Sequence, residues 1–134
     1  QFSVSLPERR YDLAGDVLAS AIDRAIHDGT AVADAVRGVA AERGRRMASD
    51  GTSEGDDLER TAEVLARHGY EPRTTEREIC LANCPFDRLA AEHTELVCGM
   101  NLALIGGVVD GLGARNATPE LAPQPGFCCV KVRG

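Results

Sequence analysis

The sequence has no tryptophan, and phenylalanine and tyrosine together supply only 4% of its 134 residues. These aromatic residues are Phe2, Tyr11, Tyr70, Phe86 and Phe127. Such a small set excludes a large aromatic cage around a ligand. Lysine occurs once, as Lys131, and the formal net charge is −6. Because a nucleic-acid-binding face needs clustered basic side chains, we expect this chain by itself to bind DNA poorly.

Long apolar runs are also missing. No stretch of about 18 apolar residues is present, so the sequence predicts no membrane span and no membrane partner. No charged segment followed by an apolar one opens the chain, which favours a cytoplasmic protein over a secreted one. The first residue is Gln1 rather than methionine. We therefore expect a piece of a longer protein, or a processed product.

Paired CxxC motifs, the strongest sequence signature of a thiolate metal site, do not occur. The five cysteines are an odd number, and all of them lie between Cys80 and the C-terminus. A secreted disulfide framework usually has an even number of cysteines in a smaller chain. In a reduced cytosol, clustered thiols bind metals, react or pack. The cysteines here are therefore candidates for one of those three roles.

What the sequence does contain is a globular composition, with 43% apolar residues, in one domain over residues 1–134. Apolar residues at three- and four-residue spacing predict helices over residues 7–29, 30–48, 56–68 and 85–112. Alternating patterns predict short strands over 70–73, 77–83, 118–122 and 127–133. The order ααα-ββ-α-ββ predicts an α+β fold, in which N-terminal helices pack with a small antiparallel sheet and one long C-terminal helix.

Small residues and alternation add detail to this prediction. Gly106, Gly107 and Gly111 lower the helix propensity of the last helix, and they allow another helix to approach closely. In the strand over 77–83, Ile79 and Leu81 lie on one face. Cys80 lies on the opposite face, and we interpret it as a packing residue.

Helix geometry decides whether Cys84 and Cys98 can share a ligand. In one unbroken helix their side chains would be separated by roughly 21 Å. A shared site therefore requires a break, which we place at His93–Thr94, with Thr94 as the N-cap of the second helix. A short helix would then end near residue 92 and a long one would run from 95 to 112.

The other candidate ligands are weaker by the same reasoning. His93 would point roughly 140° away from Cys98 within one helix, so capping or packing is its more favourable role. On a regular strand Cys128 shares the inward face with Val130, whereas Cys129 points to the opposite side. Only one of the two would easily reach a common site. Spacing alone therefore favours structural cysteines over a metal site.

The segments NCPFDRLAAEHTELVCGMNLALIGGVVDGLG (83–113) and PQPGFCCVKV (123–132) resemble the C-terminal sensory half of ArsR-like winged-helix bacterial transcriptional regulators. This group includes iron–sulfur repressors of the SufR type. The opening FSVSLPERRYDLAGDVLASAI (2–22) resembles the junction that follows their DNA-binding domain. The resemblance thus covers nearly the whole chain.

This resemblance implies a homodimeric repressor whose sensory domain holds a cluster through three cysteines. Cys84 and Cys98 match the motif, and the third ligand is Cys128 or Cys129. DNA would be bound only through an N-terminal winged helix that this chain lacks. A similar Cys-Pro motif, helix and late cysteine occur in 4-vinyl-reductase-type small-molecule-sensing domains. Their late cysteine precedes an alternating apolar strand, which favours Cys128 here.

Three hypotheses follow. The first is a sensory and dimerisation domain that binds an iron–sulfur cluster or zinc through Cys84, Cys98 and Cys128 or Cys129. The second is a small-molecule-sensing module of the 4-vinyl-reductase-like kind, with structural cysteines and no metal. The third, an enzyme with Cys98 as nucleophile and His93 as base, is disfavoured by their angular separation. We therefore expect a regulator domain and not an enzyme.

Overall fold

The computed structural model describes residues 6–134, so Phe2 and the rest of segment 2–5 lie outside the described residues. In the described part the helices and strands alternate in blocks, as predicted. In chain order they are α1 (Tyr11–Asp28), α2 (Val32–Ala48), α3 (Asp57–Arg67), β1 (Pro72–Thr74), β2 (Glu78–Leu81), α4 (Asp87–Glu92), α5 (Thr94–Leu112), β3 (Thr118–Leu121) and β4 (Val130–Arg133).

Local signals set some of the helix ends. Asp56 caps α3, because its carboxylate accepts a 2.8 Å hydrogen bond from the backbone N–H of Glu59. Gly29 ends α1 in the left-handed conformation, with φ 70°. The predicted start of the first helix near residue 7 is wrong, since α1 begins only at Tyr11. Before it, the backbone N–H of Arg10 is hydrogen-bonded to the carbonyl of Pro85, which draws this segment away from the helix.

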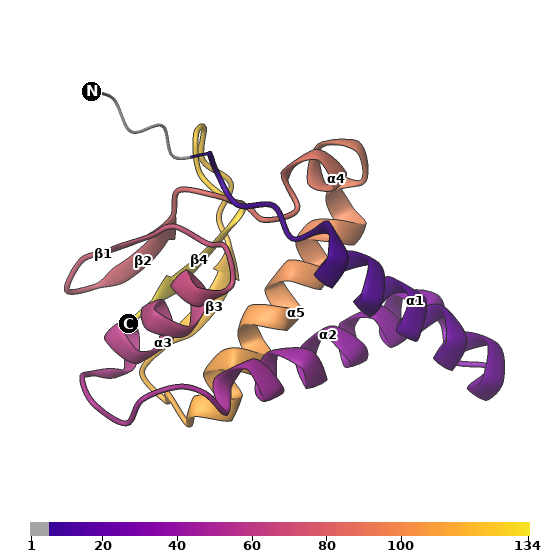
Figure 1. Cartoon of the computed structure of the whole chain (residues 1–134), viewed down its shortest axis with the longest axis horizontal. Helices are drawn as coiled ribbons and strands as arrows, with labels where there is room; N and C mark the ends of the chain where they lie inside the picture. The colour runs from indigo at the N-terminus through magenta and orange to yellow at the C-terminus, as the bar shows by residue number, and fades with distance from the viewer. Residues whose placement is uncertain (1–5) are drawn as a thin grey trace.

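The four strands form one antiparallel sheet in the order β1-β2-β4-β3 (Figure 1). Ile79 is paired with Val132 in the sheet, and both are fully buried, as are Leu81 and Val130. This apolar face joins the core residues of α3 and α5. The predicted α+β fold is therefore confirmed, and Ile79 and Leu81 share the inward face as expected.

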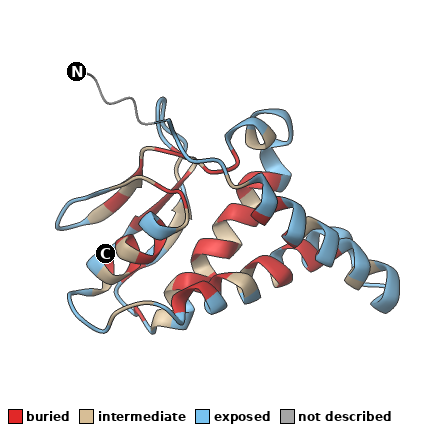
Figure 2. Ribbon diagram, in the orientation of Figure 1, coloured by how far each residue is buried: buried red, intermediate tan, exposed pale blue. Residues whose placement is uncertain are grey.

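The central element of the core is α5, which lies between α2 and the sheet (Figure 1). Buried residues run along its length in Figure 2, with Met100, Leu104 and Val108 at most 1% exposed. By length and composition alone α5 is apolar enough to cross a membrane, with a mean hydropathy of 1.5. In this structure α5 is a core helix, because it packs against α2, α3 and the sheet.

Close contact between α2 and α5 depends on glycine. A Cβ atom on Gly107 would collide with the backbone carbonyl oxygen of Ala41, and one on Gly44 would collide with that of Leu104. A Cβ atom on Gly111 would lie 2.9 Å from that of Ala48. The predicted close approach is confirmed at Gly107 and Gly111. At Gly106 it is wrong, because the nearest atom there, in Pro119, is 4.0 Å away.

Candidate metal centre

The chain breaks between α4 and α5 where the sequence predicted. Helix α4 ends at Glu92, His93 has the non-helical angles φ −133° and ψ 58°, and α5 begins at Thr94. The break is confirmed, but the prediction of Thr94 as N-cap is wrong. Thr94 is the first residue of α5, and its hydroxyl donates a 2.8 Å hydrogen bond to the carbonyl of Ala90 instead. The bend lets α5 return past the loop that precedes α4.

Side-chain contacts bring four thiols together. Cys84 lies in the loop before α4, Cys98 lies near the start of α5, and Cys128 and Cys129 lie in the loop that leads into β4. The side chain of Cys128 contacts those of Cys84 and Cys129, and the side chain of Cys129 also contacts Cys98. Contacts therefore link all four sulfurs in the order Cys84, Cys128, Cys129, Cys98.

The contacts make the four thiols unequal as acids. Hydrogen bonds from Cys129 and then from Cys84 hold the pKa of Cys128 far below that of an ordinary thiol. In return, the contact with Cys128, followed by burial, raises the pKa of both Cys84 and Cys129. Cys128 is therefore the more acidic member of this interacting group of thiols, and Cys84 and Cys129 are the less acidic ones.

Polar N–H groups also point at the sulfurs. The backbone N–H of Phe86 donates to Cys84, and the backbone N–H of Val130 donates to Cys128. The side-chain amide of Asn101 donates a further bond to Cys128, with 3.1 Å between Nδ2 and Sγ. A neutral thiol is a weak acceptor, whereas a thiolate is a strong one. These donors therefore suit sulfurs that carry negative charge, as metal ligands do.

The expectation that only one of Cys128 and Cys129 reaches the site is wrong. The reason is local: β4 begins at Val130, so neither cysteine belongs to the regular strand in which side chains alternate. A turn at Pro125–Gly126 and a bend at Cys129 precede the strand. Both sulfurs consequently face the same cluster.

The four sulfurs do not form a finished cage. Within residues 6–134, no group of three or more His, Cys, Asp or Glu side chains is arranged to hold a metal ion. The pairwise contacts link Cys84 to Cys98 through Cys128 and Cys129. The donor set itself fits the chemistry, since zinc and iron–sulfur clusters are both bound by cysteine thiolates. Cys84, Cys98 and the Cys128–Cys129 pair are the residues that would hold either one.

Two other candidates lie away from this cluster. Cys80 is half-buried on β2, and its sulfur is 3.1 Å from the carboxylate of Glu78, which also binds Lys131 at 3.1 Å. That carboxylate raises the pKa of Cys80, with burial adding to the effect. His93 is exposed at the bend between α4 and α5. Neither position brings its side chain into the thiol cluster.

The segment that leads into α1 is attached to the loop that carries Cys84. The guanidinium group of Arg9 binds the side-chain oxygen of Asn83 and lies 3.4 Å from the carbonyl of Cys84. The Asn83 amide in turn donates to the carbonyls of Glu8 and Gly69, at 2.8 and 2.7 Å. A cavity of about 300 Å³, lined partly by Arg9, Cys84 and Cys128, opens beside these contacts.

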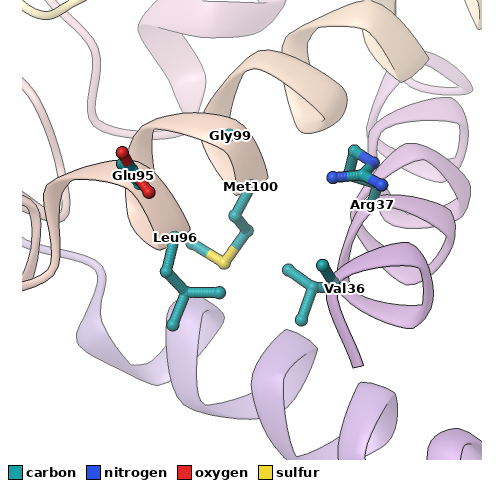
Figure 3. A pocket seen from close by; sticks show the side chains of 7 residues that line it. Val36, Arg37, Glu95, Leu96, Gly99 and Met100 are labelled. Carbon is teal, nitrogen blue, oxygen red and sulfur yellow. The ribbon is translucent and has the colours of Figure 1, made fainter. Parts of the chain in front are cut away.

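A second hollow lies between α2 and α5. Val36 and Arg37 line one side, and Glu95, Leu96 and Met100 line the other (Figure 3). Its volume of about 320 Å³ is at the lower end of the range for small-molecule sites. No cysteine lines this hollow, so it is separate from the thiol cluster.

Sequence reasoning missed Asn101, and it missed Tyr70, whose hydroxyl group donates a hydrogen bond to the side-chain oxygen of Asn101. The available signal was a polar residue, Asn101, in the otherwise apolar run of α5. A buried amide needs hydrogen-bond partners, so its presence there indicated a polar site nearby.

Neither the protein-family models, the curated proteins nor the solved structures gave a match to this chain.

Proposed function

We propose that the chain is the ligand-sensing and dimerisation domain of a transcriptional regulator, and that it binds an iron–sulfur cluster or zinc through cysteines. The observation that supports this proposal is the set of side-chain contacts that links Cys84, Cys128, Cys129 and Cys98. The N–H donors aimed at Cys84 and Cys128 add support. A bound cluster would supply sensitivity to oxidants, whereas zinc would report metal availability.

Reconstitution tests this function directly. Anaerobically purified chain, treated with ferrous iron and sulfide, is expected to gain visible thiolate-to-iron absorbance and bound iron that gel filtration does not remove. Incubation with zinc instead distinguishes a simple metal site from a cluster site. Absence of both a bound cluster and bound zinc would refute the proposal. A bound organic molecule in its place would point to the small-molecule-sensing alternative.

Contacts behind the site offer a route for a signal. The loop that carries Cys84 is hydrogen-bonded through Asn83 and Pro85 to residues 8–10, just before α1. A ligand that draws Cys84 toward Cys98 would act on this segment first. In the proposed regulator, the DNA-binding domain precedes it, so two positions of the segment would correspond to two positions of that domain.

Dimerisation is proposed through the hairpin of α1 and α2. This hairpin projects on the side of α5 that faces away from the sheet (Figure 1), and it carries Ile22, Ile26 and Val32 with 50%, 72% and 54% of their surfaces exposed. Ile22 and Ile26 are four residues apart and so share one helix face. Apolar side chains on a shared face favour contact with a second copy of the chain.

Replacing Ile26 with glutamate is expected to convert a dimer into a monomer, because a charge would then be buried in the contact between copies. Light scattering after gel filtration at matched concentrations measures the mass. Leu6→Glu is the control, since Leu6 is also exposed, at 83%, but lies outside the hairpin. Equal masses for wild type, Ile26→Glu and Leu6→Glu would contradict an interface at this face.

A further inference from the structure

We propose that Asn101 is a positioning residue of the thiol centre. Its side-chain amide, oriented by Tyr70, holds the Cys128 sulfur in place as a ligand and adjusts the electron density on it. This inference rests on the proposed function, since it assigns a role to a residue that is not itself a ligand.

The geometry places Asn101 between the two halves of the centre. It lies on α5 one turn after Cys98, is 1% exposed, and donates from Nδ2 to the sulfur of Cys128 at 3.1 Å. It therefore joins the helix that carries one thiol to the loop that carries another. The link is made by a single buried side chain.

Tyr70 determines which way the amide points. Its hydroxyl group donates a hydrogen bond to Oδ1 of Asn101, and Tyr70 is 2% exposed. Since the oxygen of the amide is occupied by this donor, the NH₂ group faces the sulfur. With both atoms satisfied, the buried amide avoids the cost of an unpaired polar group.

An N–H donor is matched to a negatively charged sulfur. A charge-assisted bond of this kind is about twice as strong as one to a neutral group. It withdraws electron density from the sulfur, and hydrogen bonds to sulfur are among the features that set the reduction potential of a cluster. Loss of the donor should therefore weaken ligand retention and lower the reduction potential.

Asn101→Leu is the direct test, because leucine has a similar size but no donor. The chelator-measured affinity for zinc is expected to fall about 10-fold, the smaller loss typical of groups that support a metal ligand. The reduction potential of the reconstituted cluster is expected to become more negative. Tyr70→Phe, which keeps the ring and removes the hydroxyl group, should shift both quantities in the same direction by less.

Thr61→Val is the matched control. Thr61 is fully buried, and its hydroxyl group donates to the Asp57 carbonyl within α3. Its replacement also removes a buried hydrogen bond but should leave affinity and potential unchanged. If Asn101→Leu and Tyr70→Phe both behave as Thr61→Val does, Asn101 has no such role. Should Asn101→Leu fail to fold, Tyr70→Phe against Thr61→Val decides the matter. A wild-type chain that binds neither zinc nor a cluster refutes the proposed function itself, and this inference with it.

Discussion

Replacing Cys128 with serine is expected to abolish stable loading of the centre with zinc or a cluster. Cys128 is the sulfur that touches both Cys84 and Cys129, and it receives the Val130 and Asn101 donors. Removing a group that only supports a ligand typically costs about 10–100-fold in metal affinity. We therefore expect loss of this ligand to cost at least about 100-fold, measured by competition with a coloured chelator.

The remaining cysteines make this test internally controlled. Cys84→Ser and Cys98→Ser are expected to lose loading as Cys128→Ser does, because those sulfurs end the chain of contacts. Cys80→Ser should leave loading unchanged, since its sulfur lies against Glu78 instead. Cys129→Ser then distinguishes three ligands from four. Full metal content in Cys128→Ser would show that the contacts around that sulfur are only packing.

Replacing Gly107 with alanine is expected to destabilise the fold by about 3 kcal/mol, at the upper end of the cost of overpacking a core. The added Cβ atom would meet the carbonyl oxygen of Ala41 and would lie 3.0 Å from its Cα. Backbone atoms cannot move aside as a flexible side chain does, so α2 and α5 would have to separate. Urea denaturation followed by circular dichroism measures the loss.

The neighbouring glycine provides the control. Alanine at Gly106 would meet no atom nearer to its Cβ than one of Pro119 at 4.0 Å, an ordinary contact distance. It should raise the free energy of unfolding by up to about 1 kcal/mol, the helix-propensity difference between the two residues. The two substitutions are adjacent and chemically identical. Equal effects on stability would show that the close crossing of α2 and α5 does not constrain this helix.

Much of the fold could be predicted from local patterns. The periodicity of α2 and α5, the capping aspartate of α3 and the alternation of Ile79 and Leu81 all specify structure over a few residues. The break at His93 could be predicted only as a condition, since Cys84 and Cys98 could share a site only if the helix ended there. The rise per residue of a helix shows that Cys84 and Cys98 are too far apart in an unbroken helix, and so shows where a break is needed.

The rest of the centre depends on contacts that no local pattern contains. Strand alternation separated Cys128 from Cys129 because it assumed a regular strand where the chain bends. The late start of α1 arises from a bond between Arg10 and Pro85, which lie far apart in the sequence. The pairing of Tyr70 with Asn101 likewise joins the segment before β1 to the middle of α5. Such contacts are determined by the assembled fold.

The origin of the four thiols has a consequence for the entropy of the chain. They come from the loop before α4, from α5 and from the loop before β4, so a shared ligand would cross-link segments that are distant in sequence. Closing such loops restricts the unfolded ensemble, which favours the folded state. Without the cross-link, two backbone bonds hold the ends of the last loop, from Cys128 to Leu81 at 2.8 Å and from Ala122 to Cys129 at 2.7 Å. The loop between β3 and β4 would therefore open more slowly when a ligand is bound to the four thiols than when it is not.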